Sequence, residues 1–410
     1  MNTSRNTIQL YLFFAAILLM FGGFLFSRAI LSIGTFLIIA NGFLQNDWKE
    51  RWAVFVSDKY LVGISCLFLF PFLSGLWSEN KTEWLSAMQD KLPLLLLPFA
   101  LAFQKGVTKK HLTSVSLLWI VFIFIGSVWS AVQYLLQREL YNQLYHSSKV
   151  IPTLASNDHI RFSMAVIIAF LLWLKLKEWK TIQGSTMYWL LNGIMIWFVF
   201  YLHLLGAKTG LLGLYTIVVP LILYLLFTTG KKTIAILGMF FILSLPVIAY
   251  KLLPTFKTRM GYILYDAGNW RTGNMNGSFS DGNRILTIQS GWYVFQKNWL
   301  AGVGYGDIKT ETNKWYNVHA PSVPLSERFL PLNQWITSGS GSGILAVLLF
   351  TIILLLPYSL NQWKKNKQAI AFITFMNLVF LYECTIDDQF GVFLFSFFTL
   401  YWHLTNRPSL

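Results

Sequence analysis

The sequence is poor in charge for its length. Charged residues make up 12% of its 410 residues, whereas soluble domains average about 25%. Hydrophobic residues take their place and account for 55% of the chain, with aromatic residues alone at 17%. That much apolar surface is too large for one globular core to hide, so a lipid bilayer is the solvent that it fits. The composition predicts a membrane protein.

Cysteine is nearly absent, and histidine forms no metal-ligand pattern. Cys66 and Cys384 lie in or beside apolar runs, and two isolated cysteines supply neither a disulfide framework nor a metal motif. We interpret them as small packing residues. The six histidines do not pair at the spacing of a metal site. We therefore expect no metal and no cofactor.

Acidic residues are scarce as well. The chain has 17 acidic and 32 basic residues, which gives a net charge of +15. In a soluble protein this excess would indicate nucleic acid, but the basic residues form short clusters between apolar runs rather than a stripe or a known binding motif. We expect no nucleic-acid partner, and we interpret the clusters as signals that orient helices among membrane lipids.

Twelve apolar runs are long enough, with their flanks, to cross a bilayer as helices. Ser27 and Arg28 separate the first run from the second, so we expect the first run to remain as an anchor rather than to be cleaved as a signal peptide. The predicted fold is an all-α polytopic membrane protein with about twelve spanning helices. The runs are 8–26, 29–46, 60–77, 89–104, 113–136, 160–176, 187–206, 209–228, 233–252, 339–359, 368–384 and 389–404.

Basic residues fall unevenly on the two sides of such a bundle. One side, with both termini, carries 16 of them, and the short loops and helix ends of the other side carry 7. The positive-inside rule places the richer side in the cytoplasm, which leaves the acidic residues Glu383, Asp387 and Asp388 outside. The richer set is Arg5, Lys49, Arg51, Lys59, Lys105, Lys109, Lys110, Lys175, Lys177, Lys180, Lys231, Lys232, Lys364, Lys365, Lys367 and Arg407. The poorer set is Arg28, Lys81, Lys91, Arg138, Lys149, Arg161 and Lys208.

One outer loop, residues 253–338, is far longer than a connector needs to be, and such loops usually carry function. It separates nine predicted spans in residues 1–252 from three in residues 339–410. Within it, residues 284–300 predict an amphipathic helix that can lie at the membrane surface. A glycine turn follows, which allows either close approach to the backbone or a tight bend. The apolar face of the helix is Ile285, Ile288, Trp292, Phe295 and Trp299. The turn contains Gly302, Gly304 and Gly306.

Three cations lie at the predicted outer boundary of the membrane. Together, Arg161, Lys208 and Arg284 predict a cationic pocket at the depth of lipid headgroups. That pocket suits a polyprenyl diphosphate-linked sugar, whose tail lies in the bilayer and whose diphosphate lies at its boundary. The alternative for each cation is contact with lipid headgroups. His159 and His319 are candidate general bases toward a sugar hydroxyl, and the alternative for both is an ordinary polar loop residue.

Several segments resemble the O-antigen ligase and O-antigen polymerase superfamily. In that family an arginine begins a helix of the large periplasmic loop, a tryptophan lies about two turns on, and a G-x-G-x-G turn follows. Arg284 to Trp292 and then Asn298 to Gly306 resemble this signature. The resemblance implies a bacterial inner-membrane protein with its termini in the cytoplasm and its large loop in the periplasm. Weaker likenesses cover Lys91 to Pro98, Asp158 to Ser163, and Ala207 to Leu212, where Lys208 stands for the family's arginine.

One position departs from the family pattern. Family ligases carry a histidine followed by Asn, Ser or Gln, then nine residues and G-x-x-G. Here Leu332 precedes Asn333 at the histidine position, and Ala346 replaces the last glycine of the motif that begins at Gly343. Leucine neither donates a hydrogen bond nor takes a proton. Either His319 substitutes for the histidine, or the acceptor is a different one, or activity is impaired.

The resemblance implies a glycosyltransferase that moves a glycan from undecaprenyl diphosphate to an acceptor hydroxyl, which in the family belongs to lipid A-core. The implied mechanism is inverting and metal-independent, with Arg284 at the diphosphate and Arg161 and Lys208 assisting. An O-antigen or exopolysaccharide polymerase of the same superfamily is the alternative. A transporter of lipid-linked glycans would place charges inside its spans, where these runs carry almost none. A purely structural membrane protein is a further alternative.

Overall fold

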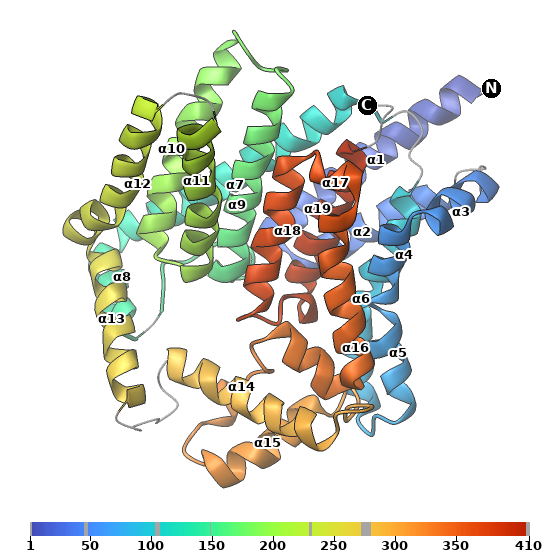
Figure 1. The fold of residues 1–410 in the computed structure, drawn as a ribbon, viewed down its shortest axis with the longest axis vertical. Helices are drawn as coiled ribbons and strands as arrows, with labels where there is room; N and C mark the ends of the chain where they lie inside the picture. The colour runs from blue at the N-terminus through green and yellow to red at the C-terminus, as the bar shows by residue number, and fades with distance from the viewer. Residues whose placement is uncertain are drawn as a thin grey trace. The chain divides into compact units, whose positions relative to one another are not determined.

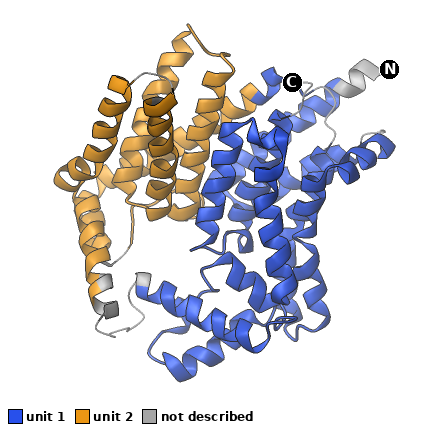
Figure 2. Ribbon diagram, viewed as in Figure 1, with its two compact units in different colours: residues 1–112, 269–410 blue, residues 113–268 orange. Residues whose placement is uncertain are grey.

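The computed structural model describes residues 2–44, 48–102, 107–147, 149–228, 232–271 and 280–406. Within these ranges every regular element is helical and none is a strand, which confirms the all-α prediction (Figure 1). The chain forms two compact units, Met1–Leu112 with Asn269–Leu410 (unit 1) and Thr113–Gly268 (unit 2), coloured separately in Figure 2. The bounds of these units differ from those of the sequence segments 1–252, 253–338 and 339–410. The segments separate predicted spans from the large loop, whereas the units are defined by contacts.

Unit 1 is organised around its last helix, α19. Every side chain from Phe390 to Leu404 in α19 is buried, so neighbouring helices cover it on all faces. The ring of Phe21 in α1 packs edge-on against Phe397 at 5.6 Å. The helices of unit 1 are α1 (Asn2–Phe26), α2 (Arg28–Phe43), α3 (Trp48–Ser57), α4 (Lys59–Cys66), α5 (Leu69–Leu73), η1 (Ser74–Leu76), α6 (Lys81–Leu101), α14 (Ser280–Lys297), α15 (Ile308–His319), η3 (Leu325–Glu327), α16 (Gln334–Ser359), α17 (Asn361–Lys364), α18 (Lys367–Phe380), η4 (Thr385–Asp387) and α19 (Gln389–Thr405).

Unit 2 is built around α9 (His159–Glu178). The side chains from Arg161 to Leu172 in this helix are all buried, so α9 occupies the centre of the unit as α19 does in unit 1. Trp119 of α7 donates its indole N–H to the backbone oxygen of Ala165, 3.2 Å away. The other helices are α7 (Lys109–Leu136), which begins in unit 1, α8 (Arg138–Leu144), η2 (Tyr145–Ser147), α10 (Thr186–Leu205), α11 (Lys208–Thr228), α12 (Lys232–Leu252) and α13 (Pro254–Arg271).

The described residues contain 8 helices that are long and apolar enough to cross a membrane, and one pair, α2 with α3, that meets the same criteria despite a bend of 111°. The chain therefore has the helices of a membrane protein. Three predicted runs fall short: α18 and α19 have 14 and 17 residues, whereas a bilayer needs about 20, and α6 carries Asp90 and Lys91. The eight spans are Thr7–Phe26, Lys59–Leu76, Lys109–Leu136, His159–Glu178, Thr186–Leu205, Lys208–Thr228, Lys232–Leu252 and Gln334–Ser359.

The helix predicted over residues 284–300 is α14, which begins four residues earlier, at Ser280, and ends at Lys297. The predicted apolar face is not the face that it buries. Trp292 and Trp299 are 47% and 57% exposed, whereas the small residues Ser290 and Gly291 are buried. The reason is the close approach of α16 and the segment before it. A side chain at Gly291 would lie 2.4 Å from Pro331, so glycine is required at that position, while the larger Leu286 and Val294 are buried about one turn to either side.

Three of the basic residues used for the orientation prediction, Lys105, Lys231 and Arg407, lie outside the described residues.

Candidate functional site

Arg284 lies in the first half of α14 and forms an ion pair with Glu383. The guanidinium Nη2 is 2.8 Å from Oε1 of Glu383, and Nη1 donates a hydrogen bond to the backbone oxygen of Tyr382 at 2.8 Å. The side chain of Glu383 is 1% exposed and that of Arg284 is 27% exposed. A buried carboxylate is thus paired with a cation that water still reaches on one side.

The segment with Leu332 runs beside this ion pair. The backbone N–H of Leu332 donates to the hydroxyl of Thr287 at 3.2 Å, and that hydroxyl donates to the backbone oxygen of Arg284 at 2.7 Å. Asn333 donates to the backbone oxygen of Leu381 at 2.8 Å. Its side-chain oxygen also caps the start of α16 by accepting the N–H of Ile336 at 3.0 Å. Leu332 therefore lies beside the helical turn that begins at Arg284.

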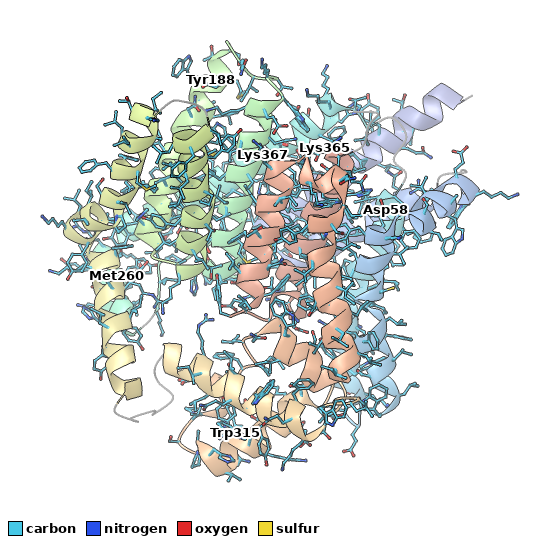
Figure 3. The ribbon with its side chains drawn as sticks, in the orientation of Figure 1. Asp58, Tyr188, Met260, Trp315, Lys365 and Lys367 are labelled. Carbon is cyan, nitrogen blue, oxygen red and sulfur yellow. The ribbon has the colours of Figure 1, made fainter. Side chains whose placement is uncertain are left out.

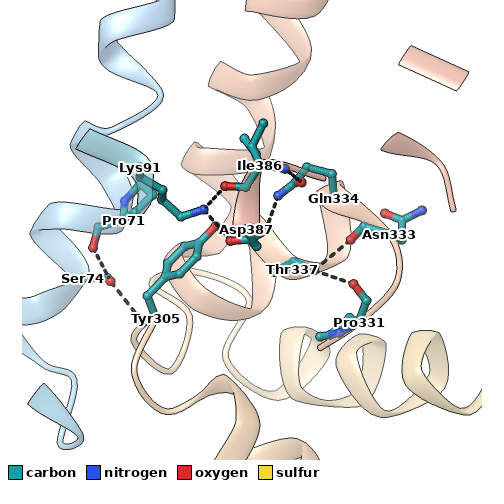
Figure 4. A network of polar contacts seen from close by, with 10 residues as sticks. All are labelled: Pro71, Ser74, Lys91, Tyr305, Pro331, Asn333, Gln334, Thr337, Ile386 and Asp387. Atoms are coloured by element: carbon teal, nitrogen blue, oxygen red, sulfur yellow. Dashed lines mark hydrogen bonds and ion pairs between the residues drawn. The ribbon is translucent and has the colours of Figure 1, made fainter. Parts of the chain in front are cut away.

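A second ion pair lies four residues further along the chain and is closed to water. Lys91 of α6 pairs with Asp387, and the two side chains are 1% and 3% exposed (Figure 4). Lys91 also donates to the backbone oxygen of Ile386 at 2.6 Å. Gln334 donates to the second oxygen of Asp387 at 2.6 Å and accepts the N–H of Ile386 at 3.0 Å. Each charge is thus hydrogen-bonded as well as paired, which a buried ion pair requires.

Tyr305 covers this pair from the side of the glycine turn. Its ring centroid lies 4.9 Å from the Lys91 ammonium, within the range of a cation–π contact. Its backbone N–H donates to the Ser74 hydroxyl at 3.1 Å (Figure 4). Burial, and then the charge of Asp387, raise the pKa of Tyr305 well above its ordinary value, so this phenol stays neutral and serves as packing around the ions.

The glycine turn fills a packing role. A side chain at Gly302 would lie 2.5 Å from the backbone of Gly341 in α16, and one at Gly306 would lie 2.1 Å from the backbone oxygen of Asn80. Gly304 has a φ of 96°, and a side chain there would lie 2.8 Å from Ser78. Of the two alternatives, close approach to the backbone is therefore correct, and the approaching groups are the protein's own helix α16 and the residues before α6.

Backbone hydrogen bonds join the turn to a break in α16. Val303 N–H donates to the Ser340 oxygen at 2.8 Å, and Gly304 N–H to the Gly341 oxygen at 3.0 Å. Such bonds are available because Gly343 has a φ of 78° and interrupts the helix. These hydrogen bonds fix the glycine turn to α16, next to the Lys91–Asp387 ion pair.

Asp307 anchors the far end of the turn. Its Oδ2 accepts the Ser78 hydroxyl at 2.8 Å and the Glu79 N–H at 2.7 Å, while Oδ1 accepts the Asn80 N–H at 3.0 Å. Asp307 is 9% exposed. Three hydrogen bonds to one carboxylate hold the loop to the chain just before α6, so Asp307 is a structural anchor rather than an open site.

His319 and Trp292 lie elsewhere in unit 1. His319 ends α15, stacks on the ring of Trp315 with centroids 4.7 Å apart, and has Nδ1 3.0 Å from the Trp315 backbone oxygen. Trp315 itself is labelled in Figure 3. The other ring contact of His319 is Tyr293, nine residues beyond Arg284 in α14 and thus about 14 Å along that helix. Trp292 packs against Phe295, with ring centroids 5.7 Å apart. The contacts of His319 are with these aromatic rings and not with the Arg284 pair.

In unit 2 the predicted cations Arg161 and Lys208 begin neighbouring helices. Asp158 caps α9 by accepting the Arg161 N–H at 3.0 Å, and its Oδ2 lies 3.6 Å from Arg161 Nε. The starts of α9 and α11 touch, since a side chain at Gly210 would lie 2.7 Å from Ser163. His159 is the first residue of α9.

Arg259 of α13 joins this end of unit 2 and was missed by sequence reasoning. It is 6% exposed, and its side-chain carbons lie 3.6 Å from the position of a Cβ at Gly206, two residues before Lys208. No apolar run or motif marks Arg259, because it lies in the polar start of the large loop. Only the contact between α13 and the turn after α10 brings it here.

The sequence did not reveal Glu383 and Asp387 as the partners of Arg284 and Lys91, although both carboxylates lie in an acidic group between two apolar runs. The predicted pocket of Arg161, Lys208 and Arg284 combines residues of both units and stays a prediction.

Within the described residues no group of three or more His, Cys, Asp or Glu side chains could hold a metal ion. Neither a protein-family model nor a curated protein matches this chain.

Proposed function

We propose that the protein is a membrane glycosyltransferase of the O-antigen ligase type. It would act in the bacterial inner membrane, with about twelve spans, both termini in the cytoplasm and residues 253–338 in the periplasm. Its donor is a glycan on undecaprenyl diphosphate, and its acceptor is a hydroxyl of lipid A-core or of another glycan. The observation that supports this most is the partly exposed Arg284 paired with the buried Glu383, beside the segment that includes Leu332.

Arg284 is suited to hold a diphosphate. A guanidinium has five N–H donors in a planar fork, and the contacts to Glu383 and to the Tyr382 backbone leave others for phosphate oxygens. As the bond between the sugar and the diphosphate breaks, negative charge grows on the leaving oxygens, and a fixed cation stabilises that charge. The part of Arg161 and Lys208 at the diphosphate stays a prediction from the sequence.

Glu383 is the group that we assign to hold Arg284 in position. It is 2.8 Å from the guanidinium and 1% exposed, so it lies on the side of the diphosphate, whereas a base must take the proton of the acceptor hydroxyl on the opposite side of the anomeric carbon. Leu332 cannot do this, and the contacts of His319 lie on Trp315 and Tyr293. The base that takes this proton stays a prediction, with His319 and His159 as its candidates.

The test is transfer by the purified protein from a defined undecaprenyl diphosphate-linked glycan, with acceptors offered in turn. Arg284→Ala and Glu383→Gln should each abolish transfer while the protein is still made and inserted. Arg138→Ala removes an exposed arginine at the start of α8 and is the matched control, expected to keep activity. Wild-type activity in Arg284→Ala would reject the site.

Leu332 favours one alternative, a polymerase of the same superfamily, because a ligase would be expected to keep histidine there. Both enzymes would use the same carrier, and they differ in acceptor. A deletion strain separates them: loss of the ligase leaves long glycan on the carrier, whereas loss of the polymerase leaves single repeats on the core. A transporter of such lipids, the alternative of another class, would move the lipid-linked glycan across vesicles without forming any new glycosidic bond.

A further inference from the structure

A groove with a polar end and an apolar remainder lies in unit 1, lined by α2, α6 and α19. Its volume is about 240 Å³, smaller than the roughly 300–1,000 Å³ of pockets that hold whole small molecules. Side chains with large exposed fractions flank it, including Phe36 at 72% and Leu92 at 41%. Because these apolar groups face away from the protein in a membrane protein, the groove opens toward lipid.

Polarity changes along the length of the groove. In α2 the lining runs from Leu31 to Ile39, and in α6 from Gln89 to Leu97, each a distance of about 12 Å along its helix. Gln389 at the start of α19 donates to the Ser32 hydroxyl at 2.7 Å, so the polar ends of these helices coincide. A slot with polar groups at one end and hydrocarbon at the other has the shape of an amphiphile.

The polar end carries an excess negative charge. Arg28 and Asp388 pair there at 3.2 Å and cancel each other. The carboxylate of Asp90 lines the groove and is partly buried. The neighbouring Lys91 is held by Asp387. An ionisable group beside lipid is costly unless a group of opposite charge meets it. The cations that act on Asp90, Arg28 and Lys91, are each paired with another carboxylate, so a further cation would balance the charge at this end of the groove.

We propose that this groove binds one acyl chain of an aminophospholipid, whose primary ammonium group lies against the Asp90 carboxylate. The chain occupies the apolar part between Ile39 and Leu97, and the headgroup stays at the end near Ser32. Anionic lipids and a polyprenyl diphosphate would place negative charge against Asp90 and are disfavoured by repulsion. This lipid site is separate from the Arg284 pair and does not depend on the proposed glycan transfer.

The experiment uses the full-length protein in nanodiscs that contain equal amounts of phosphatidylethanolamine and phosphatidylglycerol. After mild delipidation, the retained lipids are counted by mass spectrometry. The wild type should retain the ethanolamine lipid about five-fold over the glycerol lipid, the size expected of one partly exposed ion pair. Asp90→Asn should lower this ratio to about one. Glu83→Gln, which removes an exposed charge from the same helix α6, is the matched control and should leave the ratio unchanged.

A second variant tests the chain rather than the headgroup. Leu96→Trp places a large ring in the groove from a partly buried position and should reduce retention of both lipids, with folding checked by gel filtration. The proposal is overturned if the wild type retains both lipids equally, if Asp90→Asn keeps the preference, or if Leu96→Trp, folded, retains lipid normally. Displacement of the ethanolamine lipid by undecaprenyl phosphate would also overturn it and would assign the groove to the carrier.

Discussion

Two ion pairs of unit 1 use carboxylates four residues apart, and they differ in how much water reaches them. Lys91 and Asp387 are 1% and 3% exposed, whereas Arg284 is 27% exposed against 1% for Glu383. In the first pair, Gln334 and the Ile386 backbone occupy the remaining positions around the charges. No side of the Lys91–Asp387 pair is open to a ligand. The Arg284–Glu383 pair is open on the side of Arg284.

The difference assigns a structural role to the Lys91–Asp387 pair and a substrate-binding role to the Arg284–Glu383 pair. The closed pair joins α6 to the segment before α19, and Tyr305 adds the glycine turn to the same place. A fixed framework of this kind is what a neighbouring binding group needs, because its own position must not change as charge develops. Removing a charge from each pair should therefore affect different properties, the first stability and the second activity.

The largest effect is expected from Asp387→Ala. This change leaves the Lys91 ammonium buried without its partner, and breaking a buried pair costs about 3–5 kcal/mol. Thermal unfolding in detergent, followed by tryptophan fluorescence, should show a markedly lower midpoint or a loss of folded protein.

The double variant Lys91→Met with Asp387→Leu is the control for this result. It removes both charges and replaces them with apolar groups of similar size, so most of the stability should return. If Asp387→Ala alone unfolds at the wild-type temperature, the closed pair does not hold the structure as described.

Arg284→Ala should act on activity more than on stability. Loss of a cation that stabilises the leaving group lowers a transfer rate by about 100-fold or more, while water can reach the position that the guanidinium vacates. Transfer from a lipid-linked glycan is measured together with the unfolding midpoint of the same sample.

Arg284→Lys sharpens this prediction. It keeps the charge but loses the planar fork, so it should recover only part of the activity. If Arg284→Ala or Arg284→Lys loses as much stability as Asp387→Ala, the Arg284–Glu383 pair is structural too, and the contrast between the two ion pairs is wrong.

A smaller effect is expected where the glycine turn meets the chain before α6. In Gly306→Ala the new methyl group would lie 2.1 Å from the Asn80 backbone oxygen, and such overpacking costs about 1–3 kcal/mol. Gly261→Ala in α13 is the matched control, because its methyl group meets nothing within 4 Å and alanine favours a helix by about 1 kcal/mol. Equal unfolding midpoints for the two variants would contradict the packing role of the turn.

The helices could be predicted from the sequence because hydrophobic period and length are local properties. The run at 187–206 became α10 (Thr186–Leu205), and 233–252 became α12 (Lys232–Leu252). The buried face of α14 could not be predicted in this way. It depends on Pro331 and on Ile336 of α16, which approach Gly291 and come from a distant part of the chain.

The candidate site was predicted only in half. Arg284 could be selected because it begins an amphipathic helix in an unusually long loop. Its partner Glu383 lies 99 residues away (383 − 284), and no local pattern connects them. The glycines were noticed as a turn, but their role depends on the φ of 78° at Gly343 and on the break that it makes in α16.

The smallest effect is expected from His319→Ala. The ring of His319 stacks on Trp315 at the exposed end of α15, and its contacts do not include Arg284 or Glu383. If His319 only packs on Trp315, this variant should keep transfer within a few-fold of the wild type and lose about 1 kcal/mol of stability or less. A loss of activity as large as that of Arg284→Ala, at an unchanged unfolding midpoint, would instead assign the base to His319. It would also mean that α15 moves toward the ion pair when substrate binds, since about 14 Å of α14 separates Tyr293 from Arg284.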